Sequence, residues 1–486
     1  MARCIMVLGT TSGAGKSWIA TALCRWYARR GLKVAPFKAQ NMSNNARVVA
    51  GGEIGSAQYF QALAAHATPD VRMNPLLLKP EADMRSQVVL MGQVDAELSR
   101  LPWRGRSLKV WPQVAAALDA LRAENDLVLI EGAGSPAEIN LRADDIVNMR
   151  TAHHAGAACL LATDIDRGGA FAHLYGTWAL LPPEDRALLR GFVLNRFRGD
   201  ASLLAPGPQM LQELTGVPTV ATLPMFWRHG LPEEDGVFDD RGGATGVVHT
   251  TVAVVAYPRI SNLDEFQPLK NVPGVRLLWV RSPAELAGLA AADWVVLPGS
   301  KHTSSDLAWL RTQGLDRAIT AHAARGGRVL GICGGLQMLG EALIDPHGID
   351  GNGPGLGLLP LVTTFAPDKT VRATATRFRN LAAPWQALSQ AAWQGYEIHH
   401  GQTALHPAMA AAGDVGRAVL PDGLGWQGGT HGQVLGLYLH GLFESPAVLQ
   451  ALFGADAPTL DTVFDGLADH ADAHFNPGFL ESLLLP

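Results

Sequence analysis

The stretch RVLGICGGLQMLG, residues 328–340, places one cysteine, Cys333, among glycines directly after an apolar run. The run 328–333 predicts a buried strand, and LQMLGEAL, residues 336–343, predicts a helix after it. A G-x-C-x-G turn between a strand and a helix is the nucleophile-elbow pattern with cysteine in place of serine, and it needs glycine because other side chains would collide in the turn. The alternative is a buried, inert cysteine. We expect the elbow, because it aims the sulfur at a ligand and the helix N-terminus favours the thiolate.

Short apolar runs of the same kind recur along the chain in two series. The first series is 3–8, 32–37, 127–131, 157–163 and 191–195, and the second is 251–256, 275–280, 294–299, 328–333 and 434–440. Strands that are apolar along their whole length are typical of parallel sheets covered by helices on both faces. The sequence therefore predicts an α/β fold of two doubly wound, mostly parallel sheet domains, residues 1–235 and 251–445. The Gly- and Asp-rich residues 236–250 predict a linker, and residues 446–486 predict a C-terminal helical tail.

The composition excludes several classes of protein. The chain has 486 residues and a net charge of -5, so it offers no basic field to attract nucleic acid. No apolar run approaches the roughly 20 residues that a membrane-spanning helix needs, and the N-terminal MARCIMVLGT predicts a first strand and not a signal peptide. The four cysteines are scattered and form no CxxC pair. We therefore expect a cytoplasmic enzyme with neither a nucleic-acid nor a membrane partner.

A phosphate-binding loop follows the first predicted strand. GTTSGAGKS, residues 9–17, opens a helix, so that backbone N–H groups, the helix N-terminus and the Lys16 ammonium converge on an anion. Five residues, where the common form has four, separate Gly9 from Gly15, which makes this a variant loop. The alternative is a Gly-rich turn that caps an ordinary helix. We expect ATP to contact Thr10, Ser12, Gly13, Gly15, Lys16 and Ser17, with the Ser17 hydroxyl on Mg²⁺.

Polar residues stand at the ends of three later strands of this domain, where open α/β sheets gather ligands. Glu131, in LVLIEGAG, is a second candidate ligand for Mg²⁺, because hard cations prefer carboxylate oxygen; a solvated turn residue is the alternative. Asp164 and Asp166 suit a metal or substrate contact or a helix cap. The Asn195 amide suits the edge of the ATP base or an ordinary turn.

The segment KAQNMSNNA, residues 38–46, crowds polar groups into one loop after the second strand. Its candidate contacts are Lys38, Gln40, Asn41, Ser43, Asn44 and Asn45. No hydrophobic core needs these groups, whereas a polar substrate bearing carboxylates or amides would use them. Ordinary polarity of a surface loop is the alternative.

A thiol nucleophile needs a base and donors for an oxyanion. His440, in LGLYLHGLF, is the expected base because it ends the last strong strand, and His399 and His400 in GYEIHHG are its rivals. The oxyanion donors are expected at Gly334 and, from the loop PGSKHTSSDL, at Gly299 and Ser300.

These motifs resemble known families. GICGGLQMLG with LYLHGLF resembles the class I glutamine amidotransferases, whose domain is flavodoxin-like, and the first domain is similar to the P-loop domain of dethiobiotin synthetases. KAQNMSNNA, EGAGSPAEINL, DIDRGGAFA and GYEIHHG together resemble the cobyric acid synthases of cobalamin biosynthesis, over nearly the whole chain. The resemblance implies ATP- and glutamine-dependent amidation of the b, d, e and g carboxylates of adenosylcobyrinic acid a,c-diamide, with Mg²⁺. It also implies glutamine contacts at Gln337 and corrinoid contacts at Lys38, Gln40, Asn41, Asn44 and Asp166.

The chain departs from the class I pattern just after His440. Most class I amidotransferases have a Glu two residues after this His, which orients the imidazole, whereas this position is Leu442 and the next carboxylate is Glu444. Glu397, a water molecule and a backbone carbonyl are further candidates to orient His440, and the sequence does not choose among them.

Three other functions fit parts of the sequence. The a,c-diamide synthases share the two-domain order but carry a different loop in place of KAQNMSNNA. A ParA/MinD-like switch ATPase uses a similar phosphate loop, but it needs no GICGG motif and usually shows a second Lys early in the loop, where this chain has Thr or Ser. The third is a binding protein with an inactive amidotransferase domain, against which the intact Cys333 and His440 argue.

Overall fold

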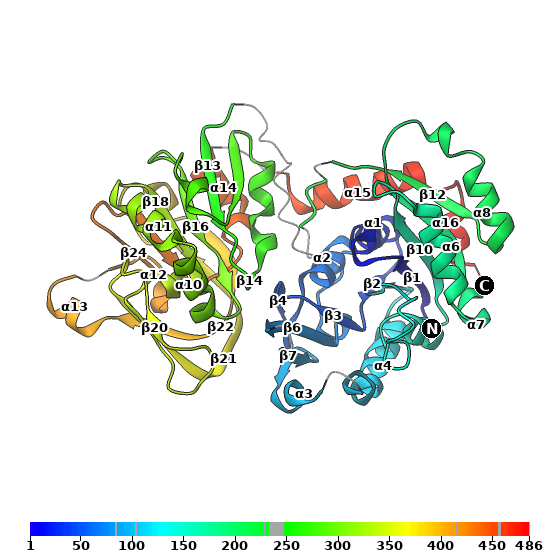
Figure 1. Ribbon diagram of the computed structural model, residues 1–486, viewed down its shortest axis with the longest axis horizontal. Coiled ribbons are helices and arrows are strands. Elements are labelled where there is room, and N and C mark those ends of the chain that lie inside the picture. The colour runs from blue at the N-terminus through cyan, green and yellow to red at the C-terminus, as the bar shows by residue number, and fades with distance from the viewer. Residues whose placement is uncertain are drawn as a thin grey trace. The chain divides into compact units, whose positions relative to one another are not determined.

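The chain folds into two compact units (Figure 1). The computed structural model describes residues 1–82, 85–102, 105–227, 229–232, 247–414, 416–454 and 458–485. The first unit contains Met1–Ser43, Val49–Leu231 and Leu460–Pro486, and the second contains Asn44–Val48 and Pro232–Thr459. Of the expected linker 236–250, residues 236–246 lie outside the described residues. The stretch 446–486, which we expected to form a C-terminal helical tail, divides between the two units.

The first unit is built on a six-stranded sheet in the order β12-β11-β10-β1-β9-β2, in which all neighbouring strands are parallel. The strands are β1 (Arg3–Gly9), β2 (Val34–Phe37), β9 (Leu127–Glu131), β10 (Ala158–Asp164), β11 (Leu189–Phe197) and β12 (Thr219–Pro224). The main helices are α1 (Lys16–Ala28), α2 (Ser56–Ala64), α4 (Arg106–Glu124), α5 (Met149–Ala155), α6 (Ala170–Leu180), α8 (Gly207–Thr215) and α15 (Leu460–His474).

Strand β1 shows why these runs are apolar throughout. Successive strand residues point to opposite faces of a sheet: Met6 and Leu8 join a cluster with α4, α5 and α6, whereas Ile5 and Val7 join a cluster with α1 and α15. Helices therefore cover both faces, as expected for a doubly wound sheet. The C-terminal α15 is part of this core, and the Trp26 indole of α1 donates to its Asp472 carboxylate at 2.6 Å.

A smaller sheet holds the start of the polar segment 38–46. Its order is β3-β6-β7-β8, with β3 (Gln40–Met42), β6 (Leu76–Ala82), β7 (Arg85–Leu90) and β8 (Gln93–Asp95). We expected a loop at Gln40–Met42. The short polar strand β3 gains its partner from β6, a pairing distant in the sequence that no local pattern marks.

The second unit has a seven-stranded sheet in the order β15-β13-β16-β18-β25-β24-β23. Its first five strands are parallel, and β24 and β23 are antiparallel. The strands are β13 (Thr250–Val255), β15 (Val275–Val280), β16 (Trp294–Leu297), β18 (Arg328–Ile332), β23 (Arg417–Ala418), β24 (Gly425–Gly428) and β25 (Val434–Leu437). Elements around it include η4 (Leu263–Asn271), α10 (Thr303–Thr312), α11 (Leu315–Ala324), α12 (Gly334–Leu339), η7 (Leu442–Glu444) and α14 (Pro446–Phe453). The mostly parallel second domain is thus confirmed.

The chain beyond the elbow differs from the expected helix 336–343. Helix α12 ends at Leu339, and the strand β19 (Ala342–Ile344) follows. A Cβ on Gly340 would lie 2.7 Å from the Leu361 carbonyl oxygen, so glycine lets the chain turn there into a second sheet. That sheet contains the long hairpin of β21 (Leu361–Arg377) and β22 (Ala392–Leu405). Among the described residues, no helix combines the length and apolarity needed to cross a bilayer.

Candidate active sites

Cys333 lies in the turn between β18 and α12, with φ 51° and ψ −106°. A positive φ is strained for a residue other than glycine, and surrounding structure must hold it. The turn packs tightly against the neighbouring strand end. A Cβ on Gly335 would lie 1.8 Å from the Leu297 carbonyl oxygen, and one on Gly334 would lie 2.8 Å from the Ser300 nitrogen. Both positions therefore require glycine.

The ends of three neighbouring parallel strands bring the candidate residues together. Strand β18 pairs with β16 on one side and with β25 on the other, and Cys333, Ser300 and His440 follow these three strands. The His440 backbone exchanges hydrogen bonds with Tyr396 of β22, and the two rings stack at 5.3 Å. A Cβ on Gly299 would lie 2.6 Å from His440 Cε1, so Gly299 faces the imidazole.

Glu265 of η4 orients the His440 imidazole. Its Oε1 lies 2.9 Å from His440 Nδ1, and its Oε2 accepts a hydrogen bond from the Gly441 nitrogen at 2.9 Å. Both side chains are buried. Fixing Nδ1 in this way leaves the other ring nitrogen available for the thiol. Glu265 cannot be recognised in the sequence, because no local pattern links SNLDEFQPL to a histidine 175 residues away.

The charges around His440 favour its protonated form. Burial alone lowers the pKa of this imidazole, but the Glu265 carboxylate, the Cys333 thiolate and hydrogen bonds to both outweigh burial and raise the pKa to about 10. An imidazolium next to the sulfur is the arrangement in which a cysteine acts as a nucleophile. Cys333 itself is only 4% exposed.

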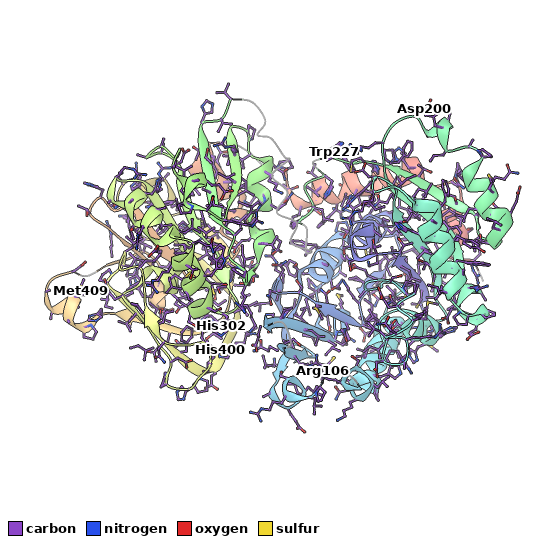
Figure 2. All side chains as sticks on the ribbon, in the orientation of Figure 1. Arg106, Asp200, Trp227, His302, His400 and Met409 are labelled. Carbon is purple, nitrogen blue, oxygen red and sulfur yellow. The ribbon has the colours of Figure 1, made fainter. Side chains whose placement is uncertain are left out.

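The other residues considered for orienting or replacing His440 have different partners. His399 lies 2.8 Å from the Gly401 carbonyl oxygen and 3.1 Å from the Glu397 carboxylate. His400, labelled in Figure 2, lies 3.2 Å from the Ala366 carbonyl oxygen. Glu444 binds the Arg47 guanidinium.

The loop after β16 is fixed by a buried carboxylate. Ser300 Oγ donates to Asp306 at 2.6 Å, and the Arg259 nitrogen donates to the same carboxylate at 3.1 Å. Burial raises the pKa of Asp306 to about 7, against the hydrogen bonds that stabilise its charged form. On the other side of the elbow, the Gln337 amide oxygen accepts from Thr303 Oγ1 at 2.8 Å.

The phosphate loop of the first unit lies between β1 and α1. Lys16 Nζ folds over the loop and donates to the Thr11 carbonyl at 2.9 Å and to the Gly134 carbonyl at 3.2 Å. Asn195 Nδ2 donates to the Ala14 carbonyl at 3.0 Å, so this amide braces the loop. Thr10 Oγ1 donates to Thr163 at 2.9 Å. Ser12, Gly13 and Gly15 lie on the same loop, with Gly15 at φ 91°.

Glu131 is the centre of a charged cluster next to this loop. Its carboxylate accepts from Ser17 Oγ at 2.8 Å, from Lys38 Nζ at 2.8 Å and from Gln61 Nε2 at 2.6 Å. Burial raises the pKa of Glu131, but Lys38 and these hydrogen bonds outweigh burial and lower it overall. An ionised carboxylate beside a hydroxyl is a set of hard oxygen donors that fits Mg²⁺ bound together with phosphate and water.

The remaining substrate candidates are spread over several elements. Gln40 Oε1 accepts from Ser107 Oγ at 3.1 Å, and Asn41 Oδ1 accepts from the Met42 nitrogen at 3.0 Å. Asp164 pairs with Arg196 at 3.0 Å, and Asp166 accepts from Arg198 at 2.6 Å. Asn44 is grouped with the second unit, and Lys38, Gln40 and Asn41 are grouped with the first.

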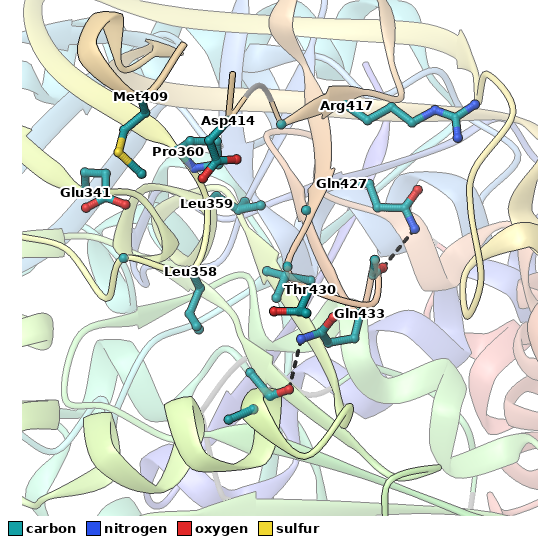
Figure 3. A pocket seen from close by; sticks show the side chains of 18 of the residues that line it. Glu341, Leu358, Leu359, Pro360, Met409, Asp414, Arg417, Gln427, Thr430 and Gln433 are labelled. Carbon is teal, nitrogen blue, oxygen red and sulfur yellow. Dashed lines mark hydrogen bonds between the residues drawn. The ribbon is translucent and has the colours of Figure 1, made fainter. Parts of the chain in front are cut away.

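A pocket of 640 Å³ lies at the N-terminal end of β25, the strand that Val434 begins and Gln433 precedes (Figure 3). Gln427 Nε2 donates to the Gly432 carbonyl and Gln433 Nε2 to the Ala323 carbonyl, at 2.8 and 2.9 Å. These amides hold the backbone around the pocket in place, and we assign the pocket no role in the chemistry.

Comparison with known families agrees with the two sites. Residues 251–448 match the CobB/CobQ-like glutamine amidotransferase domain, and residues 5–235 match the CobQ/CobB/MinD/ParA nucleotide binding domain. The chain is therefore an amidotransferase ligase that combines a nucleotide-binding domain with a glutamine-hydrolysing one. The second domain decides against a switch ATPase of the ParA/MinD kind.

Relatives of full length define the family more closely. The cobyric acid synthases of Polaromonas naphthalenivorans (strain CJ2) and Variovorax paradoxus (strain S110) are each 77% identical to this chain, over 99% of both chains. That of Leptothrix cholodnii (strain ATCC 51168 / LMG 8142 / SP-6) is 64% identical over 100% of this chain and 98% of its own. The chain belongs to the cobyric acid synthase family, and it is a glutamine-dependent amidoligase of cobalamin biosynthesis.

Proposed function

We propose that the enzyme converts the b, d, e and g carboxylates of adenosylcobyrinic acid a,c-diamide to amides, with one ATP and one glutamine for each, and releases adenosylcobyric acid. The observation that carries this proposal is the pairing of two complete sites in one chain. One unit holds Cys333, His440 and Glu265, and the other holds a phosphate loop beside Glu131. The name of the family, cobyric acid synthase, supports the corrinoid product. The scattered, free cysteines support a cytoplasmic location.

In the amidotransferase unit, Cys333 is the nucleophile and His440 holds its proton. The sulfur attacks the glutamine amide carbon, and His440 gives the proton to the departing ammonia. Backbone N–H groups of Gly334 and of the Gly299–Ser300 loop stabilise the oxyanion, and one such donor is worth about 2.7–4 kcal/mol of barrier. Gln337 contacts the bound glutamine. Water then releases glutamate from the thioester.

In the nucleotide-binding unit, the phosphate loop activates the acid. Lys16 and the loop N–H groups from Thr10 to Gly15 hold the phosphates, and Asn195 keeps that loop in shape. Ser17 and Glu131 would hold Mg²⁺, which supplies charge neutralisation on the phosphates. A substrate carboxylate attacks the γ-phosphate in line, ADP leaves as the bond to the β-phosphate breaks, and ammonia then displaces phosphate from the resulting acyl phosphate. Lys38, Gln40, Asn41, Asn44 and Asp166 are the proposed corrinoid contacts.

Two measurements test this function. Cys333→Ser is expected to lose glutamine-dependent amidation and to retain turnover with added ammonia. Mass spectrometry of the corrinoid product is expected to show four new amides on the a,c-diamide. Two new amides on unamidated cobyrinate would instead identify an a,c-diamide synthase, and a wild-type enzyme that releases no glutamate from glutamine would exclude both.

A further inference from the structure

A short segment from the N-terminal part of the sequence belongs to the amidotransferase unit. Residues Asn44–Val48, which overlap β4 (Ala46–Val49), are grouped with Pro232–Thr459. Asn45 Oδ1 accepts a hydrogen bond from the Leu263 nitrogen at 3.1 Å, and the Ala46 carbonyl accepts one from Asn262 Nδ2 at 2.7 Å. The segment is therefore tied to the start of η4, the element that carries Glu265.

Arg47 is the charged residue of this segment, and it is 1% exposed. Its guanidinium forms ion pairs with Asp264 and with Glu444, and it lies 5.0 Å from the centre of the Tyr396 ring. Burial lowers the pKa of Arg47, but the two carboxylates outweigh burial and hold it well above its usual value. The planar guanidinium, with its fixed set of donors, suits two acceptors in different directions better than an ammonium does.

Each partner of Arg47 is next to a group that holds the catalytic histidine. Asp264 directly precedes Glu265 in η4. Glu444 is the last residue of η7, and η7 begins directly after Gly441, whose nitrogen donates to Glu265. The Tyr396 ring stacks on His440, and the Tyr396 hydroxyl accepts a hydrogen bond from Asn262 Nδ2 at 2.7 Å. Arg47 thus joins η4, η7 and β22, the three elements around the imidazole.

The surroundings of Arg47 and His440 concentrate negative charge. The ionisable groups around the guanidinium and the base are Asp264 and Glu265 from η4, Tyr396 from β22, Glu444 from η7, His440 after β25 and Cys333 after β18. Burial raises the pKa of Glu444, and Arg47 opposes that rise. Without the guanidinium, Asp264 and Glu444 would lose their counter-charge, and the pKa of Glu444 would rise further.

We propose that Arg47 is a positioning residue of the glutaminase: it holds the Glu265–His440 pair in place and supplies the positive charge between Asp264 and Glu444. The amidotransferase site is therefore completed by a residue that directly follows the polar segment 38–46 in the sequence. Neither the amidotransferase family match nor the nucleophile motif includes this residue.

The test compares Arg47→Met and Arg47→Lys with the control Arg317→Met, an exposed arginine on α11. Glutamate release from glutamine is measured over a range of pH, and ammonia-dependent, ATP-driven amidation is measured in parallel. For Arg47→Met we expect kcat for glutamine to fall by up to about 100-fold, the loss that a misplaced catalytic group causes, with KM for glutamine and the ammonia-dependent rate unchanged. Loss of the positive charge favours the protonated form of Glu444, so the acidic limb of kcat/KM should move to higher pH.

Arg47→Lys keeps the positive charge but loses the planar guanidinium with its fixed set of donors. We therefore expect an intermediate kcat and an acidic limb of kcat/KM that does not shift. A wild-type kcat and pH profile in Arg47→Met would overturn the proposal, and so would an equal loss of the ammonia-dependent rate. If thermal unfolding shows that Arg47→Met does not fold, Arg47→Lys decides, and a wild-type kcat in that variant overturns the proposal.

Discussion

The contact between Glu265 and His440 makes a sharp prediction for the variant Glu265→Gln. Glutamine keeps the shape of the side chain and an oxygen that can accept from His440 Nδ1, but it removes the charge. In the wild type, the pKa of His440 is raised to about 10 from an ordinary 6.5, although burial by itself lowers it, and Glu265 makes the largest contribution to the rise. At 1.36 kcal/mol per pKa unit, this difference corresponds to about 5 kcal/mol in favour of the imidazolium.

Without this carboxylate, burial dominates and His440 is expected to be neutral at pH 7. The imidazolium next to the sulfur then loses most of the roughly 5 kcal/mol that favoured it. The barrier should rise by about 4 kcal/mol, so kcat/KM for glutamine hydrolysis should fall about 1000-fold. The assay is glutamate release from pH 5.5 to 9.5, together with the rate at which iodoacetamide inactivates the enzyme. Both rates should drop in the variant near neutral pH and partly recover as the pH rises.

The matched control is Glu397→Gln, which changes the carboxylate that pairs with Arg372 and His399. This change should lower kcat/KM for glutamine hydrolysis by less than about tenfold, because Glu397 is not the partner of His440 Nδ1. A Glu265→Gln enzyme with wild-type kcat/KM, or a loss at Glu397→Gln as large as at Glu265→Gln, would refute the assignment of the orienting carboxylate.

Three further changes have definite expected outcomes. Gly335→Ala places a Cβ 1.8 Å from the Leu297 carbonyl oxygen and should destabilise the enzyme by about 3 kcal/mol with loss of glutaminase, whereas Gly288→Ala, which meets no atom within 4 Å, should stay within about 0.5 kcal/mol by urea unfolding. Asp306 has a folded pKa of about 7 against 3.8 unfolded, so the folded state binds more protons between these values. The contribution of Asp306 to the free energy of unfolding should therefore fall by about 3 kcal/mol as pH rises from 4 to 7, and Asp306→Asn should lose this contribution. Lys16→Met should lower ammonia-dependent ADP release at least about 100-fold and leave basal glutamate release unchanged; equal loss of both would contradict the separation of the two sites.

The parts of the fold and site that the sequence predicts are those encoded within a few residues. The parallel strands follow from apolar runs, because both faces of each strand are buried. The elbow at Cys333 and the phosphate loop at Lys16 follow from glycines whose absent side chains make room for backbone. His440 is predictable from its place at the end of a strand that turns out to pair with the strand of Cys333.

The parts that the sequence does not predict depend on pairings between distant segments. Glu265 lies in a 3-10 helical stretch whose acidic residues look like an ordinary solvated surface, and only the fold of the second unit brings it to His440. Arg47 is more remote still, because it joins the amidotransferase unit from the N-terminal part of the chain. A buried carboxylate or guanidinium is costly unless its counter-charge is in place. In this unit the counter-charge for Asp264 comes from residue 47, so the electrostatic support of the catalytic histidine is a property of the assembled chain and not of the amidotransferase segment alone.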